Sequence, residues 1–424
     1  MTTPPDSTPP DSTPPDSTPP LEVPLLQLRD GLPTVVDDAA GLAVTIDSFR
    51  AGTGPFAIDA ERASGYRYSQ RAYLLQLRRE GAGTALIDPI GFGDVPNQSL
   101  VKLSDTMSDV EWVIHAASQD LPCLAALGMR PHRLFDTELA GRLLNYPRVG
   151  LAVLVEELLG YRMRKEHSAV DWSRRPLPEP WLRYAALDVE MLIELRDVLA
   201  RELGAAGKAQ WAAQEFAAWA AMGAASPRLE PWRRVSGIHR VRGRRGLALV
   251  RAMWQLRDDL ARVRDITTNR ILSDATIIEA AQTAPTSRTA LGRIAGFATR
   301  GGQRYLREFA TVIADAQVLA DGDLPTLSAQ QDGPPPPRTW PDKFPAAAAR
   351  LASCREALRS LAEQYELPQE NLLAPDAVRR LAWAPPIPAT PELVRLRLEA
   401  SAARPWQVTL TAEALAESLA VTDT

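Results

Sequence analysis

The stretch "PFAIDAERAS", residues 55–64, ends an apolar run with two carboxylates and decides how the first half of the chain is interpreted. Phe56–Ile58 is apolar, and Asp59 and Glu61 follow with one residue between them. Alternate side chains of a strand share a face, so these two carboxylates point the same way. Ionised carboxylates at that distance repel and resist burial unless a cation joins them. The pattern is therefore either a solvated strand end or part of a metal site whose other acids lie elsewhere.

The composition is that of a soluble globular protein with two or three domains. The chain has 424 residues, 45% hydrophobic and 24% charged, and a formal net charge of -4. This charge excludes a wholly basic nucleic-acid-binding protein but allows a local basic patch. Cys123 and Cys354 have no C-x-x-C partners, which argues against a disulfide framework and a zinc site. We also find no secretory signal and no apolar run of roughly 18 residues, so we expect no membrane contact and a cytoplasmic location.

Pattern and composition divide the chain into six segments. Residues 1–22 contain three "PPDST" repeats and no core-forming pattern, so we expect a disordered Pro-rich tail. Strand and helix patterns alternate over the next segment, and beyond it only helical patterns occur. The remaining segments are an α/β domain (23–205), a helical connector (206–229), a helical domain (230–325), a Pro-rich linker (326–343) and a second helical domain (344–424).

The first domain is predicted to be α/β with a mixed sheet. "PFAIDAE", "RAYLLQLRR" and "GTALIDPI" read as three strands, the last two joined by a hairpin turn at "EGAG". "EWVIHA" and "RLFDT" read as two further strands, separated by a helix at "DLPCLAALG". Helical periodicity then covers "GLAVLVEELLG" and the long segment that begins "PEPWLRYAALDVEM". A meander followed by strand–helix alternation indicates such a sheet.

Three further residues complete a candidate site with Asp59 and Glu61. Asp120 begins a helix that follows a strand, where the helix dipole favours the ionised carboxylate, although an N-terminal cap is the common role there. Tyr184 and Asp188 lie four residues apart on one helical face, where a surface pair is the common role. Four carboxylates and a tyrosine could surround two hard divalent cations, Mg²⁺ or Mn²⁺. Two such ions about 4 Å apart stabilise the attacking and leaving oxygens of a phosphodiester displacement.

The motifs carry a family resemblance. "DAE" at 59–61, "HAASQDL" at 115–121 and "YAALD" at 184–188 resemble the three motifs of the DEDD 3′–5′ exonucleases with a tyrosine. "DWSRRPL" at 171–177 and "FDTEL" at 135–139 narrow the resemblance to ribonuclease D. It implies a ribonuclease H-like fold, release of 5′-mononucleotides, four metal-binding acids and a tyrosine that positions water. The catalytic set carried over is Asp59, Glu61, Asp120, Tyr184 and Asp188, with the four acids as metal ligands. Ala60 stands where the family commonly has Thr.

The helical half resembles the HRDC domain of ribonuclease D and certain helicases. The matching features lie in "RAMWQLRDDLARVRDI", "ILSDATIIEAA" and "LGRIAGF", and "LLAPDAVRRLA" in the last segment resembles a second copy. Seven arginines and no acid occupy residues 233–251, which is either a solvated basic face or a phosphate-contacting patch. We predict the patch, with nucleic-acid contacts from Arg233, Arg234, Arg240, Arg242, Arg244, Arg245 and Arg251.

Two residues near the motifs have other interpretations. His115 ends an apolar strand and is expected in the core or behind the site. Asp136 either supports the site or caps the next helix.

We predict a metal-dependent 3′–5′ exoribonuclease that trims tRNA precursors and other small structured RNAs. The alternatives are a DNA 3′–5′ exonuclease on the same fold and a nucleic-acid-binding scaffold whose nuclease site has decayed. The intact set of acids argues against decay. The sequence contains no G-x-x-x-x-G-K-[ST], so no nucleotide cofactor is expected.

Overall fold

The computed structural model describes residues 23–93, 98–164, 169–223, 228–328 and 333–420. The repeat tail at residues 1–22 lies outside these ranges. We refer to residues 23–223 as the first unit, 228–328 as the second and 333–420 as the third. No helix in these ranges is both long and apolar enough to cross a membrane. Cys123 and Cys354 are free, buried thiols.

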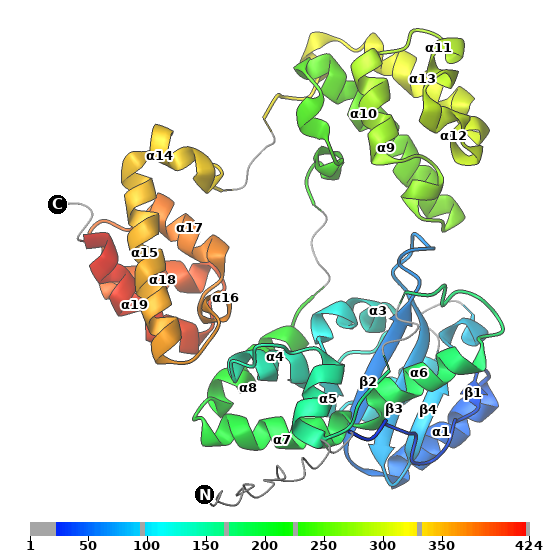
Figure 1. Cartoon of the computed structure of the whole chain (residues 1–424), viewed down its shortest axis with the longest axis vertical. Coiled ribbons are helices and arrows are strands. Elements are labelled where there is room, and N and C mark those ends of the chain that lie inside the picture. The colour runs from blue at the N-terminus through cyan, green and yellow to red at the C-terminus, as the bar shows by residue number, and fades with distance from the viewer. Residues whose placement is uncertain (1–22, 94–97, 165–168, 224–227, 329–332, 421–424) are drawn as a thin grey trace, which may run out of the picture.

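A six-stranded mixed sheet forms the centre of the first unit (Figure 1). Its order is β1-β4-β3-β2-β5-β6; β3 is antiparallel to both of its neighbours and every other pair is parallel. The strands are β1 (Val35–Val36), β2 (Thr53–Arg62), β3 (Ala72–Glu80), β4 (Gly83–Ile87), β5 (Glu111–Ile114) and β6 (Arg133–Asp136). The predicted mixed sheet is confirmed. The two-residue strand β1 was not predicted, because it is too short to show an alternating pattern.

Helices cover both faces of this sheet and extend beyond its β6 edge. They are α1 (Ala39–Ala51), α2 (Gln98–Met107), α3 (Leu121–Ala126), α4 (Thr137–Leu143), α5 (Leu151–Leu159), α6 (Glu179–Glu190), α7 (Leu192–Ala205) and α8 (Ala209–Ala220). The long helical pattern after residue 178 is two helices rather than one. The chain leaves helical geometry at Met191, with φ -118° and ψ 9°, so that α6 packs on β2, β3 and β4 while α7 packs on β2 and β5.

The second unit is helical and has a core of its own. Its helices are α9 (Gly243–Arg264), α10 (Asp274–Thr283), α11 (Arg288–Gly292), α12 (Arg300–Arg304) and α13 (Leu306–Gln317). Ser273 caps α10 as expected, because its side chain accepts a hydrogen bond from the Thr276 N–H. The unit meets the loop between β2 and β3, where the Tyr68 hydroxyl donates to Asp258 at 3.0 Å and the Ser69 N–H donates to Asp265 at 2.8 Å.

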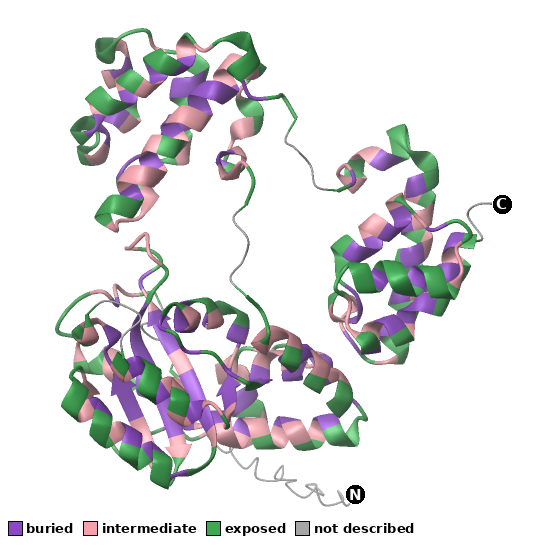
Figure 2. Ribbon diagram, turned by 180° about the vertical axis from the view of Figure 1, so that it is seen from behind, coloured by how far each residue is buried: buried purple, intermediate pink, exposed green. Residues whose placement is uncertain are grey.

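The third unit shares its core with the first. Its helices are α14 (Trp340–Lys343), α15 (Pro345–Gln364), α16 (Gln369–Leu372), α17 (Pro375–Trp383), α18 (Pro391–Ala400) and α19 (Pro405–Ala420). Trp406 of α19 stacks on Trp211 of α8, with ring centroids 5.1 Å apart, and its indole N–H donates to Glu215 at 3.0 Å. One cluster of buried apolar residues therefore runs from the sheet into α15 and α19. Figure 2 shows buried residues along the strands and on the inner faces of the helices. The predicted connector thus contains α8, which packs as part of the first unit.

Candidate active site

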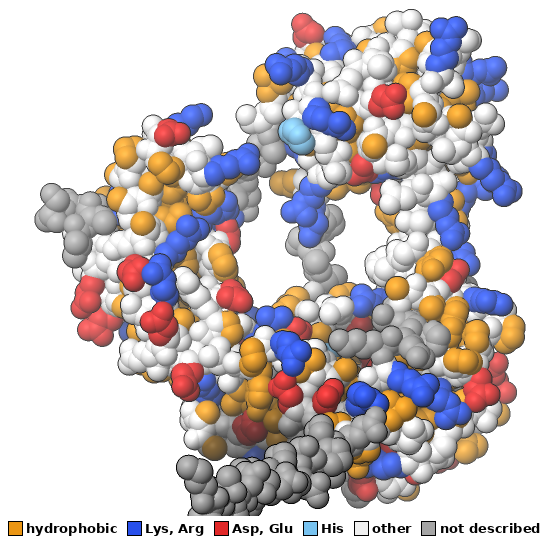
Figure 3. Space-filling model, in the orientation of Figure 1, with side chains coloured by type: hydrophobic (Ala, Val, Ile, Leu, Met, Phe, Trp, Pro, Cys, Tyr) orange, Lys and Arg blue, Asp and Glu red, His pale blue; other side chains and the backbone are white. Residues whose placement is uncertain are grey.

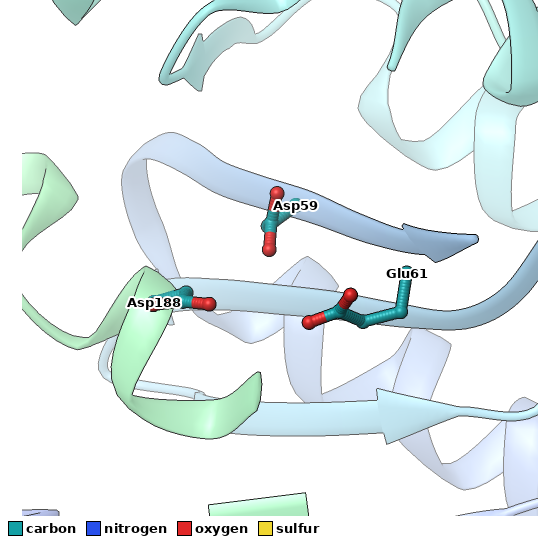
Figure 4. Close-up of side chains that lie close together, drawn as sticks. All are labelled: Asp59, Glu61 and Asp188. Carbon is teal, nitrogen blue, oxygen red and sulfur yellow. The ribbon is translucent and has the colours of Figure 1, made fainter. Parts of the chain in front are cut away.

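The two carboxylates of the opening motif lie near the end of β2, inside the sheet. β2 pairs with β3 on one side and β5 on the other, so its backbone is held by hydrogen bonds along both edges. Asp59 and Glu61 share a face, as the strand period requires. One carboxylate oxygen from each of Asp59, Glu61 and Asp188 lies within 4.8 Å of the other two, and Figure 4 shows the three side chains pointing toward one another. Glu61 is only 8% exposed, so the solvated strand end is excluded.

Helix α6 brings the third motif over this face of the sheet. Ala185 and Ala186 are fully buried, and their small side chains allow the helix to pack closely on the strands. Asp188 then meets the β2 acids, and the Tyr184 hydroxyl, one turn earlier, hydrogen-bonds to Asp188. Burial and the neighbouring carboxylates Asp188 and Glu61 raise the pKa of Tyr184 well above its usual value, so the hydroxyl stays protonated.

Asp120 joins the cluster from the second motif. It occupies the N-cap position of α3, but its side chain makes no capping hydrogen bond. Asp120 is 4% exposed, and its carboxyl group hydrogen-bonds to Asp59. The Arg62 guanidinium lies 3.4 Å from the Asp120 carboxylate. The structure therefore brings all four predicted acids and Tyr184 together, with Asp120 adjacent to the group of three rather than within it.

Asp136 supports the turn that precedes Asp120. Its carboxylate accepts the Ala116 N–H at 3.1 Å and the Ala117 N–H at 2.9 Å, and it also accepts the N–H groups of Glu138 and Leu139. Ala116 has a left-handed backbone (φ 57°), a conformation that costs energy in a non-glycine residue. The two hydrogen bonds from this turn offset that cost. Asp136 is thus both a helix cap and a support of the site, so the two sequence interpretations hold together.

His115 takes no direct part in the cluster. Its Nδ1 lies 2.9 Å from the Thr137 hydroxyl, behind the acids. Burial lowers its pKa to about 4, so the ring is neutral at physiological pH. This agrees with the expectation of a residue in the core or behind the site.

The electrostatics of the cluster favour a divalent cation. Burial raises the pKa of Glu61 to about 10, and the charges of Asp59, Asp188 and Asp120 add to the effect. Burial likewise raises the pKa of Asp59 and of Asp188 above their usual range. Buried carboxylates that repel one another hold protons unless a cation compensates them. An all-oxygen donor set suits hard cations such as Mg²⁺ or Mn²⁺, so the residues present fit the divalent metal that the motifs imply.

One residue directly beside the acids was not predicted from the sequence. Gln76 is the register partner of Asp59 across the β2–β3 ladder, and its side chain is fully buried. Neither its amide oxygen nor its amide nitrogen has a hydrogen-bond partner within the described residues. A buried amide of this kind costs free energy unless a partner is supplied, which is unusual outside functional sites. The sequence "YLLQLRR" shows a polar residue within an apolar strand, which could have marked Gln76 as unusual. Only the strand register shows that Asp59 is its neighbour.

A pocket of about 260 Å³ opens beside Tyr184 and Asp188. Met163, Pro180 and Leu187 supply apolar walls, and Arg164 supplies positive charge. Arg183 also lines the pocket, ion-paired at 3.0 Å with Glu179 of the same lining. An apolar pocket with flanking cations at a site of clustered acids has the chemistry to hold a nucleotide.

Four of the seven arginines predicted to contact nucleic acid bind the protein's own backbone. Arg244 donates to the carbonyls of Asp321 and Leu324, at 2.7 and 2.8 Å, and Arg245 donates to that of Leu319 at 2.6 Å. Arg233 and Arg251 bind neighbouring carbonyls of the same segment, those of Thr326 and Asp323. These contacts fasten residues 319–326 to the start of the second unit. Exposed guanidinium groups remain at Arg234, Arg240 and Arg242, and their contact with nucleic acid stays a prediction.

Three family models match the chain. Residues 33–204 match a model described as 3′–5′ exonuclease, and residues 246–313 match the HRDC domain. Residues 333–419 match a model described as the 3′ to 5′ exonuclease C-terminal domain. The likeness of this last region to a second HRDC domain therefore stays a prediction.

Curated relatives match along most of the chain. Ribonuclease D of Gluconacetobacter diazotrophicus is 30% identical over 364 residues, covering 83% of this chain and 87% of the relative. Ribonuclease D of Acidiphilium cryptum is 32% identical over 317 residues, covering 72% of this chain and 77% of the relative.

Solved structures share the architecture. A protein from Bifidobacterium adolescentis, 36% identical, superposes with a TM-score of 0.86 over 94% of this chain and all of that one. Escherichia coli RNase D, described as an exoribonuclease involved in structured RNA processing, is 24% identical; its TM-score is 0.68 over 91% of this chain and 98% of that one. The latter similarity establishes a common fold.

Proposed function

Since the chain belongs to the ribonuclease D family and is a 3′–5′ exoribonuclease, we propose that it removes nucleotides singly as 5′-monophosphates at the cluster of Asp59, Glu61, Asp120 and Asp188. The observation that carries this proposal is the convergence of three separate motifs on one acidic cluster, in which Glu61 and Asp120 are buried and Asp59 and Asp188 half-buried. The proposed division of labour follows the chain: residues 23–205 cut RNA, and the helical units after them hold it.

We propose that the four acids hold two divalent cations, Mg²⁺ or Mn²⁺. When bound, such a pair stabilises the attacking and leaving oxygens of the phosphodiester. The protein's contribution is a rigid set of oxygen donors. Asp59 and Glu61 are held by pairing with β3, and the residues just before them, Phe56–Ile58, also pair with β5. Asp188 is held by the packing of α6, and Asp120 is held by the turn that Asp136 supports.

Tyr184 has the role of positioning the attacking water. Its hydroxyl keeps its proton because burial raises its pKa, and it donates that proton toward Asp188. The hydroxyl oxygen then accepts a hydrogen bond from water beside the acids. The adjoining pocket, with its apolar walls and the cation Arg164, is proposed to receive the 3′-terminal nucleotide.

The proposed substrates are tRNA precursors and other small structured RNAs. The relatives named ribonuclease D and the structured-RNA role described for the Escherichia coli protein support this choice. A DNA exonuclease on the same fold is the alternative that the site geometry does not separate, because sugar discrimination depends on contacts to the 2′-hydroxyl.

The test compares RNA and DNA of identical sequence, each labelled at the 5′ end. We expect stepwise shortening of RNA with Mg²⁺, no cleavage with EDTA, and much slower shortening of DNA. Asp188→Asn should lose turnover and still bind RNA, because the acids hold metal while cationic residues hold phosphate. Equal cleavage of both polymers would overturn the assignment to RNA, and full activity in Asp188→Asn would overturn the site.

A further inference from the structure

A second basic stretch lies in the second unit, C-terminal to the one noted in the sequence. Between Glu279 and Glu308 the chain carries five arginines and no acid. They are Arg288, Arg293, Arg300, Arg304 and Arg307, and all five are exposed. Figure 3 shows Lys and Arg side chains along the edge of the second unit where Figure 1 places α11 and α12.

Three of these arginines surround one hollow. Arg288, Arg304 and Arg307 line a cavity of about 380 Å³ together with Gln303, and Arg288 and Arg307 also line an adjoining one of about 290 Å³. Within the described residues, none of the three forms an ion pair with a carboxylate, so their positive charge is uncompensated there. The N–H groups of Arg244 and Arg245, by contrast, are occupied by backbone carbonyls.

A pair of glycines packs α12, which carries Arg300 and Arg304, on the turn of the second unit that meets the first unit. A Cβ atom on Gly301 would lie 2.2 Å from the carbonyl oxygen of Arg270, and one on Gly302 would lie 2.5 Å from that of Gly296. Only glycine permits such close packing of α12 on the turn at residues 270–271. The same turn reaches the β2–β3 loop, where the Arg270 guanidinium lies 5.6 Å from the centre of the Tyr66 ring.

An aromatic ring holds Arg304 of the hollow and one further cation, Arg264. The guanidinium groups of Arg264 and Arg304 lie 5.5 and 5.6 Å from the centre of the Tyr305 ring. Cation–π contact restricts where these long side chains point while leaving their N–H groups available to an anion. Exposed cations thus run from Tyr66, five residues after the metal-binding Glu61, through Arg270, Arg264 and Arg304 to the hollow.

We propose that this surface, defined by Arg264, Arg270, Arg288, Arg304 and Arg307, binds the phosphates of RNA upstream of the 3′-terminal nucleotide. The inference rests on the proposed function, because it requires RNA as the substrate. Guanidinium groups match phosphate geometry and contact the backbone without reading sequence, as an enzyme that degrades successive nucleotides requires. The surface begins at the loop that follows Glu61, so RNA leaving the active site meets it first.

The experiment measures RNA affinity of the full chain with Arg288, Arg304 and Arg307 all changed to Ala. Binding of a labelled single-stranded RNA is followed by fluorescence anisotropy in EDTA over a range of salt concentrations. Each phosphate contact contributes about 0.7 to the slope of log affinity against log salt, so three lost contacts should flatten it by about 2. At about 0.1 M salt this corresponds to a loss of affinity of about 100-fold, which should vanish near 1 M.

Two further variants separate this surface from general charge and from packing. Changing Arg355, Arg359 and Arg395 of the third unit to Ala removes the same charge from exposed positions elsewhere and should leave the slope near that of the parent. Replacing Arg288, Arg304 and Arg307 by Lys should retain most of the slope, because lysine keeps the charge.

The outcomes are distinct. The proposal is overturned if the Ala variant of the hollow binds within twofold of the third-unit variant, or if the Lys variant loses as much affinity as the Ala variant. Cleavage of a very short RNA by the Ala variant should match the parent, since such an RNA does not reach the hollow. If the parent itself fails to cleave RNA, the proposed function is refuted, while the binding comparison in EDTA still decides the surface.

Discussion

Replacing Glu61 by Gln should stabilise the metal-free protein and weaken its response to metal. Glu61 is 8% exposed and its pKa in the fold is about 10, against a usual value of 4.5. A carboxyl whose pKa is raised by folding binds more protons in the folded state, so stability is full below the usual pKa and falls as pH rises toward the raised one. The glutamine amide has nearly the same shape and no charge, so it removes this dependence.

The magnitude follows from the shift. Each pH unit above 4.5 costs the parent about 1.4 kcal/mol, which makes about 5 kcal/mol at pH 8 and less than about 1 kcal/mol at pH 5. A buried amide without a full set of partners costs about 1–3 kcal/mol, so the net stabilisation expected at pH 8 is about 2–4 kcal/mol. For a unit of this size that is a rise in Tm of at least about 4 °C.

Thermal unfolding in EDTA at pH 5 and pH 8 measures this effect. The variant should be more stable than the parent at pH 8 and no more stable at pH 5, and added Mg²⁺ should raise the Tm of the parent far more than that of the variant. Glu156→Gln, which changes an exposed carboxylate on α5, is the matched control and should change neither value. Equal Tm values for parent and Glu61→Gln at pH 8 in EDTA would refute the reasoning, as would an undiminished response of the variant to Mg²⁺.

Two other substitutions test the site and the frame around it. Tyr184→Phe keeps the ring and all four acids, so Mg²⁺ should still raise the Tm of this variant. Its kcat on a short RNA should fall by about 100-fold, because the attacking water loses a positioning contact. A kcat within twofold of the parent would mean that the tyrosine is a packing residue. Trp406→Ala should reduce the free energy of unfolding by about 3–5 kcal/mol, because it removes a 4%-exposed ring stacked on Trp211 and the indole donor to Glu215, which keeps its ion pair with Arg404. Denaturant unfolding measures the loss, and a cost below about 1 kcal/mol would mean that the third unit does not share a core with the first.

The acidic site was accessible from sequence because each part of it is a local pattern. Asp59 and Glu61 share a face through the two-residue period of a strand, and Tyr184 and Asp188 share one through the turn of a helix. Strand–helix alternation likewise indicated a mixed sheet. The resemblance of the ordered motifs to a known family then linked parts that no local rule connects.

Tertiary structure alone decided which side chains meet across long distances in the chain. The register of β2 and β3 sets Gln76 beside Asp59, and a single strand pattern cannot specify register with a partner. Folding also distributes the arginines. Those at 244 and 245 bind backbone carbonyls of residues about 75 positions away, whereas Arg288, Arg304 and Arg307 surround a hollow. A sequence shows how many cationic side chains the chain has. Whether each of them is available to a ligand depends on the partners that the folded structure supplies.

The boundary between the second and third units shows the same difference between what local sequence and tertiary structure determine. The linker predicted at 326–343 lacks regular structure at its described start, but it ends in a 3-10 turn at Pro337–Thr339 and in α14, whose Trp340 is fully buried. Proline-rich composition predicts an interruption because proline has no backbone donor, but it does not exclude a helix that begins within the segment. Composition says nothing about where the helices beyond it pack. Trp406 and Trp211 lie nearly 200 residues apart, and their stacking joins two helical segments into one core. Local propensity thus determined the elements and the acids they carry, whereas burial, which depends on the whole chain, decided their neighbours.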